Sequence, residues 1–216
     1  EKIDKPVIFI GTGTCGLGAG AGKTLAAVRS HLDAQAIEAD IVEVGCIGLC
    51  VAEPVVDIQM PGKARMSFSN ITADDAPGLI DSVFAGEIDL AKVLGQFPAS
   101  DGQEAWDAPL LSDHPFFAAQ TRWVLANCGL VDPASINEYI ARGGYRAFAR
   151  SLRETTPIEL CDLVESSGLR GRGGGGFPAG RKWKFAQGAA SSQRYLICNA
   201  DEGDPGAFMD RAVIEG

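Results

Sequence analysis

The chain has 216 residues, of which 46% are hydrophobic, and carries 19 basic against 28 acidic side chains for a net charge of −9. This composition is typical of a globular protein and argues against a general binder of nucleic acids or anionic membranes. Its two histidines, His31 and His114, lie outside HExxH and GxSxG motifs, which argues against a His-rich zinc hydrolase and a serine triad. The sequence also contains no apolar run of the roughly 20 residues that a membrane span requires.

The first 94 residues predict a small α/β domain of thioredoxin type. Apolar stretches bounded by turn residues indicate strands, and apolar residues at helical spacing indicate helices. The predicted elements, in chain order, are strand 6–10, helix 22–35, strands 40–44, 54–59 and 66–70, and helix 75–90. Residues 95–115 contain three prolines and two glycines among polar residues, and we interpret them as a linker.

Residues 116–216 predict the start of a second α/β domain that opens with helices. Expected in chain order are helices at 116–127, 131–142, 145–153 and 157–167, a buried strand at 194–200, and a helix at 211–216 that is cut off partway. Since the chain also lacks an initiating methionine, we expect it to be a piece of a longer protein.

Two glycine motifs near the start of the chain resemble nucleotide-binding signatures. Residues 11–16 satisfy GxGxxG after a strand, but the acidic residue that a dinucleotide site needs has only Glu43 as a loose candidate. Residues 18–24 resemble a P-loop, but Leu17 stands where its first glycine is required. We therefore interpret the first motif as a tight turn and assign no nucleotide hydrolysis to the second.

Six cysteines without a secretory signal suggest a reducing compartment, so we expect a cytoplasmic protein whose cysteines are thiols, redox groups or metal ligands. Cys15, Cys46 and Cys50 lie on two loops that each follow a predicted strand. Such loops can converge at one end of a sheet, where the three thiolates would meet around iron. A 2Fe–2S cluster normally takes four cysteines, so the sequence supplies three ligands of four.

The strongest feature of the sequence is a glycine-rich loop, with seven glycines between Gly168 and Gly180. Six basic residues and no acidic one fall between Ser166 and Ala200. Bare backbone N–H groups together with fixed positive charge are a common means of binding phosphate. Phe177 and Trp183 add flat faces for a ring. The alternative interpretation is a flexible linker, in which Arg, Phe, Pro and Trp are rarely interleaved in this way.

Acidic and amide side chains follow the predicted strand at 194–200. Asn199, Asp201 and Glu202 lie at its carboxyl end, where ligands of α/β folds bind, and could accept hydrogen bonds from ribityl hydroxyls or an amide. The alternative is an acidic turn that caps the next helix.

The glycine loop and the stretch 198–208 together resemble the family of NADH-oxidising flavin subunits. This family includes the flavin-binding subunit of complex I, the beta subunits of NAD-linked hydrogenases and formate dehydrogenases, and the NADH-oxidising modules of benzoyl-CoA reductase complexes. Residues 114–117, 127–129 and 139–145 are similar to this family too, and a leading thioredoxin-like domain is typical of its soluble branch. The resemblance implies an enzyme subunit that takes hydride from NADH onto FMN and passes single electrons to iron–sulfur clusters.

The resemblance also implies a set of cofactor-binding residues. It places FMN and NADH contacts at Gly171, Arg172, Gly173, Gly174, Gly175, Phe177, Lys182, Phe185, Asn199, Asp201, Glu202 and Asp204. Within this set, Gly174, Gly175, Phe177, Phe185 and Asp204 would lie towards NADH. No residue is assigned a catalytic role of its own, because the chemistry is the flavin's.

The family continues past residue 216 with a Cys-rich segment for a 4Fe–4S cluster. The resemblance therefore implies that the chain is an N-terminal portion with an incomplete flavin site, inactive by itself. It implies partner subunits in an electron-transfer complex, including an iron–sulfur thioredoxin-like subunit, with no nucleic acid and no membrane insertion. The boundaries we expect are 1–94 for the thioredoxin-like domain, 95–115 for the linker and 116–216 for the incomplete FMN/NADH domain.

The first domain resembles thioredoxin-like ferredoxins, which carry Cys-x4-Cys on one loop and Cys-x3-Cys on another. Cys46 and Cys50 match the Cys-x3-Cys pair. Cys15 matches the second cysteine of the Cys-x4-Cys pair, and Ile10 stands where its first cysteine would be. A cluster with a non-cysteine fourth ligand, a cluster-free docking domain and a redox disulfide between Cys46 and Cys50 all remain open. The competing hypothesis for the whole chain is a non-catalytic docking or assembly module with a degenerate thioredoxin-like domain and a truncated flavin lobe.

Overall fold

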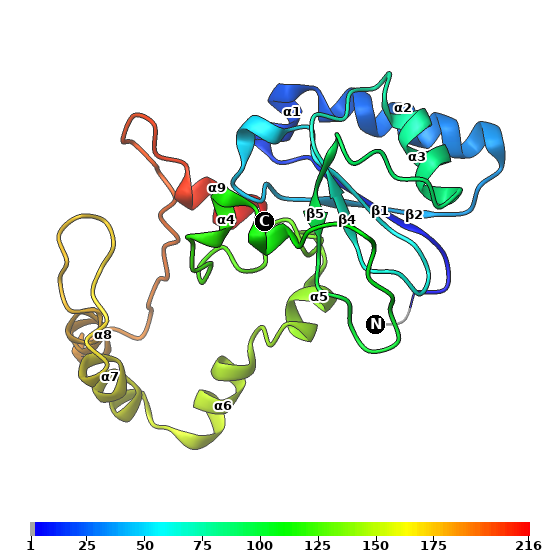
Figure 1. Ribbon diagram of the computed structural model, residues 1–216. Helices are drawn as coiled ribbons and strands as arrows, with labels where there is room; N and C mark the ends of the chain where they lie inside the picture. Colours follow the sequence, from blue (N-terminus) through cyan, green and yellow to red (C-terminus); the bar gives the residue numbers. More distant parts are fainter. Residues whose placement is uncertain (1–2) are drawn as a thin grey trace. The chain divides into compact units, whose positions relative to one another are not determined.

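A computed structural model describes residues 3–216 and divides them into two compact units (Figure 1). The first unit runs up to Ser135 and also includes Asp201–Gly216, and the second is Ile136–Ala200. Among the residues described, we find no helix with the length and apolar character that crossing a membrane demands.

The first unit is built on a five-stranded mixed sheet. Its strands are β1 (Val7–Gly11), β2 (Asp40–Val44), β3 (Val56–Gln59), β4 (Met66–Phe68) and β5 (Val93–Gln96), in the order β2-β1-β3-β4-β5. β1 and β2 are parallel, and the other neighbours are antiparallel. Its first three helices are α1 (Thr14–Ala19), α2 (Ala21–Gln35) and α3 (Ala76–Phe84). The predicted α/β class and the order of the thioredoxin-like elements are confirmed.

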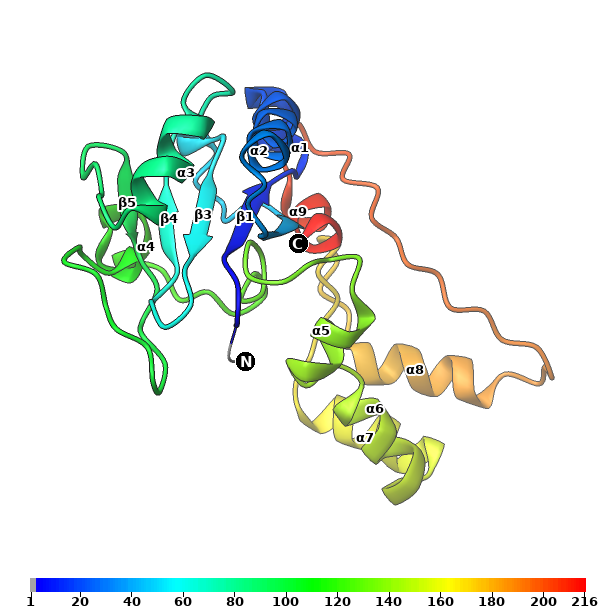
Figure 2. The same ribbon diagram turned by 90° about the vertical axis from the view of Figure 1, so that its right-hand side faces the viewer.

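One face of the sheet forms the main core. The strand register places Ile8 opposite Ile58 and Ile10 opposite Val56, so all four side chains point to the same face. Helices α2 and α3 cover this face with their apolar stripes (Figure 2), through Leu25, Val28, Leu32, Ile80 and Val83. Ile10 is fully buried here, so the residue at the fourth cysteine position packs in the core.

The other face holds a buried ion pair. Arg65 Nε donates to Asp57 Oδ2 at 2.7 Å, and the guanidinium carbon lies 3.5 Å from the centroid of the Phe9 ring. The same guanidinium donates through Nη2 to the Gly129 carbonyl at 2.6 Å. A buried charge needs such partners, because losing one would leave the other uncompensated at a cost of about 3–5 kcal/mol. Arg65 thereby ties the segment around Gly129 to the sheet.

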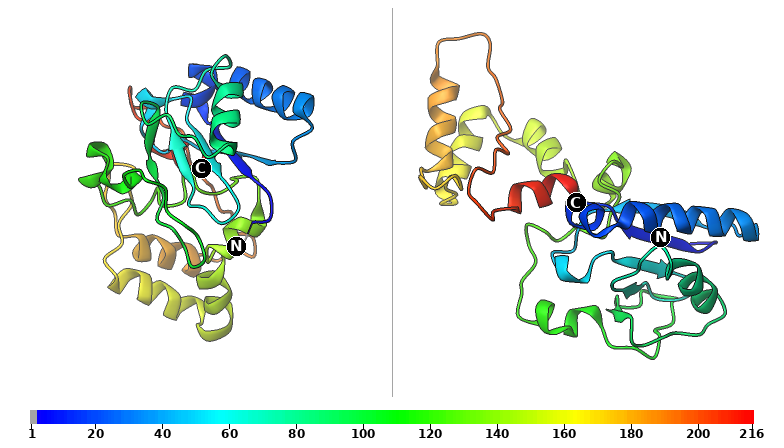
Figure 3. Two further views of the ribbon diagram at one scale, coloured as in Figure 1. Left: turned by 45° about the vertical axis from the view of Figure 1, so that its right-hand side comes forward. Right: turned by 90° about the horizontal axis from the view of Figure 1, so that it is seen from above.

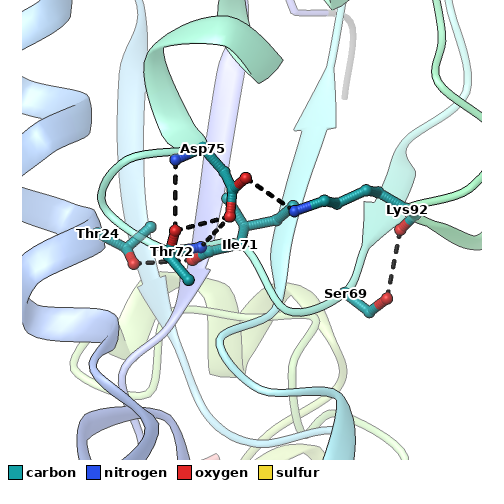
Figure 4. Close-up of polar contacts among 6 residues, drawn as sticks. All are labelled: Thr24, Ser69, Ile71, Thr72, Asp75 and Lys92. Atoms are coloured by element: carbon teal, nitrogen blue, oxygen red, sulfur yellow. Dashed lines mark hydrogen bonds and ion pairs between the residues drawn. The ribbon is translucent and has the colours of Figure 1, made fainter.

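Polar contacts join α2, the turn before α3 and the residues before β5 (Figure 4). Thr24 Oγ1 donates to the Ile71 carbonyl at 2.8 Å in the buried interface. Asp75 Oδ2 accepts from the Thr72 backbone N–H and hydroxyl, at 3.1 and 2.6 Å, and its Oδ1 lies 2.9 Å from Lys92 Nζ. These contacts fix the start of α3 in the manner of a capping box.

Two elements of the first unit differ from the sequence prediction. Helix α1 forms within the small-residue stretch that we interpreted as a tight turn. The segment 95–115, expected as a linker, packs on the unit: its first residues complete β5, Leu111 is buried, and the Gln96 amide donates to the carbonyls of Trp106 and Ala108. The segment packs because Trp106 and Leu111 bury apolar surface against the unit, which the side chains of a flexible linker do not do.

The second unit is helical. Its helices are α5 (Ile136–Ala141), α6 (Arg146–Glu154), α7 (Pro157–Ser166) and α8 (Ala179–Gly188), and α7 and α8 lie side by side (Figure 3). A Cβ added at Gly180 would lie 2.3 Å from the Glu165 backbone nitrogen, so this close approach requires glycine. A capping box formed by Thr156 and Glu159 begins α7.

Two predictions for the later part of the chain are wrong. The helix expected at 116–127 is reduced to α4 (Pro115–Ala118), because Arg122 donates to the carbonyls of Leu125 and Cys128 and holds the stretch in turns. No strand forms at 194–200, where Leu196 and Ile197 are 101% and 83% exposed; within the described residues no strand lies beside this segment to pair with its backbone. The final helix is α9 (Met209–Glu215).

The Asp75 contacts predict a pH dependence of stability. Hydrogen bonds from Thr72, with the ion pair to Lys92, lower the pKa of the Asp75 carboxyl from its ordinary 3.8 to about 2. Because the folded-state pKa is depressed, this stabilisation is complete above the ordinary value and is lost as the pH falls through about 2. Solvent screens part of it, so we expect Asp75→Asn to lower the free energy of unfolding at neutral pH by about 1 kcal/mol.

Urea unfolding between neutral pH and pH 2 measures this effect. The difference between the wild type and Asp75→Asn should shrink as the solution is acidified. The exposed neighbour Asp74, changed to Asn, provides the control and should leave stability unchanged. An Asp75→Asn variant as stable as the wild type at neutral pH would contradict the assignment.

Candidate functional site

Three thiols meet at one end of the sheet in the first unit. Cys15 lies in the first turn of α1, Cys46 in the loop after β2, and Cys50 at the start of a short 3-10 helix (Cys50–Ala52). The Cys50 Sγ lies 3.1 Å from the Cys15 Sγ and 3.8 Å from the Cys46 Sγ, and all three sulfur atoms fall within 4.8 Å of one another. The convergence predicted from the sequence is therefore found, and all six cysteines of the chain are free thiols.

A close backbone contact positions Cys15. A Cβ added at Gly16 would lie 1.9 Å from the Gly11 carbonyl oxygen, so α1 packs directly on the end of β1. Only glycine permits this approach. The GxGxxG pattern at 11–16 is thus a strand-to-helix turn in which two of the glycines touch.

Hydrogen bonds and burial tune the thiols. The Gly48 backbone N–H donates to the Cys46 sulfur at 3.3 Å, but burial is the larger effect and raises the pKa of the Cys46 thiol well above its ordinary value. The hydrogen bond with Cys50 raises the pKa of Cys15, whereas the guanidinium of Arg211 acts in the opposite direction. Arg211 belongs to α9, and its Nη2 lies 3.7 Å from the Cys15 Sγ.

A buried carboxylate lies behind the thiols. Glu53 is 6% exposed, and its Oε2 accepts from the Val55 backbone N–H at 2.7 Å. Burial raises the pKa of this carboxyl, while hydrogen bonds from Val55 and the Cys46 thiol act in the opposite direction. On the other side of the site, Glu215 of α9 accepts from the Thr14 backbone N–H at 2.9 Å and from its hydroxyl.

The donor set fits a thiolate-bound metal. Two thiolates on one tetrahedral metal ion, with bonds of about 2.3 Å, lie roughly 3.8 Å apart. The Cys46–Cys50 separation has this value and the Cys15–Cys50 separation is somewhat shorter. Sulfur donors of this kind are characteristic of zinc and of iron–sulfur clusters.

The glycine loop of the second unit forms a closed turn with bare backbone at its tip. Hydrogen bonds from Gly171 N–H to the Phe177 carbonyl and from Arg170 Nη1 to the Gly176 carbonyl close its base. At each of the four successive glycines from Gly173 to Gly176, an added Cβ would meet nothing within 4 Å. The backbone of the tip is therefore open to a ligand on all four residues.

The basic side chains near this loop fall into two classes. On α8, Lys184 pairs with Asp162 and Glu165, and Arg181 pairs with Glu165, so these two cations hold α7 against α8. Lys182 on the same helix and Arg172 in the loop are exposed and make no ion pair within the described residues. They are the positive charges that the fold leaves available for an anionic ligand.

The remaining predicted site residues lie in different places. Phe177 and Phe185 come together, with ring centroids 6.3 Å apart. Asn199 belongs to the second unit, whereas Asp201, Glu202 and Asp204 belong to the first. Glu202 caps α9: its carboxylate accepts from the backbone N–H groups of Asp210 and Arg211 at 2.8 and 3.3 Å. This is the helix-capping alternative raised by the sequence.

Sequence reasoning missed three side chains at the three-thiol site, namely Glu53, Arg211 and Glu215. Arg211 and Glu215 are nearly 200 residues from Cys15, and no local pattern joins them. Glu53 lies between Cys50 and a β-strand, in an Ala-Glu-Pro sequence, and a charged residue next to a buried strand was the available signal.

Comparison with known proteins bears directly on the glycine loop. Residues 164–216 match the Nuo51 FMN-binding domain family. The expected resemblance to this family is confirmed for that part of the chain. The chain is 58% identical over 97 residues to the NADP-reducing hydrogenase subunit HndC of Solidesulfovibrio fructosivorans, covering 45% of this chain and 19% of that protein. It is 51% identical over 92 residues to the F 2 subunit of the NADH-quinone oxidoreductase of Rhizobium meliloti, covering 43% and 22%. The matches thus span about a fifth of these relatives.

Two solved structures are also similar. A thioredoxin-like 2Fe–2S ferredoxin from Aquifex aeolicus aligns with 46% of this chain and 98% of its own, at 13% identity and a TM-score of 0.38. An NAD+-reducing NiFe-hydrogenase in the air-oxidized state aligns with 97% of this chain and 32% of its own, at 24% identity and a TM-score of 0.32.

The contact between Gly16 and Gly11 predicts a sharp sensitivity to one methyl group. We expect Gly16→Ala to push α1 off the end of β1 and to lower the free energy of unfolding by about 1–3 kcal/mol. Gly18→Ala on the same helix is the matched control, because a Cβ there meets nothing within 4 Å. Urea unfolding of both variants measures the difference, and equal stability of the two would contradict the proposed contact.

Proposed function

We propose that this chain is part of the flavin subunit of a multi-subunit oxidoreductase, which takes hydride from NADH onto FMN and passes electrons singly to iron–sulfur clusters. The observation that carries the proposal is the open glycine backbone at 173–176 beside Arg172 and Lys182, two cations without an ion pair among the residues described. These residues fall within the match to the Nuo51 FMN-binding domain. The names of the relatives, which belong to an NADP-reducing hydrogenase and to an NADH-quinone oxidoreductase, support the same function.

The loop binds the phosphate end of the flavin. The N–H group of Gly173 approaches the phosphate without steric hindrance, and Lys182 and Arg172 neutralise its charge. Gly171, whose own N–H donates to the Phe177 carbonyl, contributes bare backbone beside it. Asn199, Asp201 and Glu202 accept hydrogen bonds from the ribityl chain.

The nicotinamide side of the site is aromatic and backbone-lined. Gly174 and Gly175 leave room for NADH, Phe177 and Phe185 pack against its rings, and Asp204 accepts a hydrogen bond from it. When bound, FMN supplies the two-electron to one-electron conversion. The residues of this chain hold the two rings at hydride-transfer distance and exclude water from between them.

The three-thiol site holds a 2Fe–2S cluster through Cys15, Cys46 and Cys50. The Cys46–Cys50 separation and the positive charge of Arg211 on Cys15 support this assignment, since a nearby cation favours the thiolate. The cluster supplies one-electron transfer when bound. Arg211 and Glu215 of α9, which follows the flavin-binding stretch, contact Cys15 and Thr14 in the first turn of α1.

The same proposal implies that this chain works together with other subunits of an electron-transfer complex. Its electrons leave through other subunits, among them an iron–sulfur thioredoxin-like one, and a 4Fe–4S cluster lies in a part of the protein beyond this chain. Six free thiols are consistent with a cytoplasmic location. Residues 1–216 alone are inactive, because the flavin site needs contacts from outside them.

A second candidate function is a docking module without redox chemistry in the first domain. The buried Ile10 at the fourth cysteine position is the observation that favours it. In that case the purified protein would hold FMN but no iron at the three thiols.

The two classes of lysine on α8 predict a selective effect on flavin binding. We expect Lys182→Ala to weaken FMN binding about tenfold or more, because it removes a charge-assisted contact to phosphate. Lys184→Ala removes the same charge from the same helix, and far-UV circular dichroism checks that α7 and α8 remain folded without the ion pairs to Asp162 and Glu165. With that condition met, Lys184→Ala should keep its FMN. FMN retained after extensive dialysis of the purified protein measures both, and equal flavin content in Lys182→Ala and the wild type would overturn the assignment.

A further inference from the structure

Glu53 is a buried carboxylate with one oxygen left without a partner. Its Oε2 accepts from the Val55 backbone N–H, but its Oε1 is buried and makes no hydrogen bond within the described residues. Glu53 forms no ion pair there either. Burying an unpaired carboxylate is costly, and proteins offset that cost with a bound proton, a cation or a metal ion.

The position of this carboxylate connects it to the three thiols. A Cβ added at Gly11 would lie 3.0 Å from Glu53 Oε2, and one added at Gly16, next to Cys15, would lie 3.3 Å from it. Glu53 follows Cys50 by three residues, and its carboxylate lies against the backbone of the strand-to-helix turn next to Cys15.

Because Gly11 and Gly16 have no side chains, the Glu53 carboxylate can occupy the space beside them. Gly11 directly follows Ile10, whose side chain is fully buried on the opposite side in the main core. The loop that lacks its first cysteine thus presents bare backbone to Glu53. An oxygen donor therefore lies against the residue that follows the missing cysteine, next to the turn that carries Cys15.

We propose that the Glu53 carboxylate is the fourth protein ligand of the metal centre held by Cys15, Cys46 and Cys50. The inference rests on the iron–sulfur centre of the proposed function and supplies the ligand that Ile10 cannot. A carboxylate is an established ligand type for iron and zinc. One thiolate pair and one mixed thiolate–carboxylate pair make the two irons of a cluster inequivalent.

Anaerobic reconstitution of the purified protein with iron and sulfide tests this ligand. Iron and sulfide per chain, the absorption spectrum and the Mössbauer spectrum are measured for the wild type, Glu53→Gln and Glu53→Cys. Glu43→Gln is the control, because it makes the same chemical change on β2, where Glu43 pairs with Arg29. Far-UV circular dichroism checks that each variant is folded.

We expect two inequivalent iron sites in the wild type and in Glu43→Gln. Glu53→Gln should lose iron affinity about tenfold or more. Glu53→Cys should keep its iron, with both sites now bound by two thiolates each and a correspondingly simpler Mössbauer spectrum. If Glu53→Gln fails to fold, the iron content and Mössbauer spectrum of Glu53→Cys test the proposed ligand instead.

Unchanged iron content and an unchanged spectrum in Glu53→Gln would overturn the proposal, and so would a wild type that binds no iron. Equivalent irons in the wild type would overturn it as well. FMN content and flavin reduction by NADH, measured on the same samples, report on the proposed function separately. Their failure with the iron ligand intact would count against the flavin assignment and leave the Glu53 ligand standing.

Discussion

The first unit depends on the contact between two glycine backbones, Gly11 at the end of β1 and Gly16 in α1. Because α1 approaches the strand this closely, Cys15 comes within reach of Cys50, and the Glu53 carboxylate fits into the space that two side chains would otherwise fill. The geometry of the three-thiol site therefore depends on the strand-to-helix turn. Arg65 supports it from the other face of the sheet by holding the segment near Gly129 in place. The thiol of the neighbouring buried residue Cys128 donates to the Ala212 carbonyl of α9.

On helix α8 of the second unit, some basic side chains form ion pairs within the fold and one does not. Arg181 and Lys184 are paired with acids of α7, which stabilises the helix pair that supports the glycine loop. Lys182, between them in sequence, has no ion-pair partner in the described part of the chain, and neither has Arg172. In a chain whose net charge is −9, these two cations beside four open glycines make a local field suited to a phosphate.

The sequence predicts the local elements well where the pattern is strong and long-range partners are not needed. The strand at 40–44 and helices α2, α6 and α7 follow from periodicity, and the meeting of Cys15 with Cys46 and Cys50 follows from loops after neighbouring strands. β5 and the packing of Trp106 could not be predicted, since they depend on tertiary contacts with β4 and Ala64. For the same reason the sequence does not reveal Glu53 and Arg211 as site residues, because they meet the thiols only after folding brings distant segments together. The apolar run at 194–200 misled the prediction because a strand requires a neighbouring strand as well as β-forming residues.

The glycine loop is the central claim, and flavin reduction tests it most directly. The protein purified from its native complex is titrated anaerobically with NADH while the visible absorption of bound flavin is followed. The account predicts bound FMN whose absorption is bleached stoichiometrically by NADH, with dialysis removing flavin faster from Lys182→Ala. A protein that holds no FMN, or whose flavin NADH leaves oxidised, would contradict it.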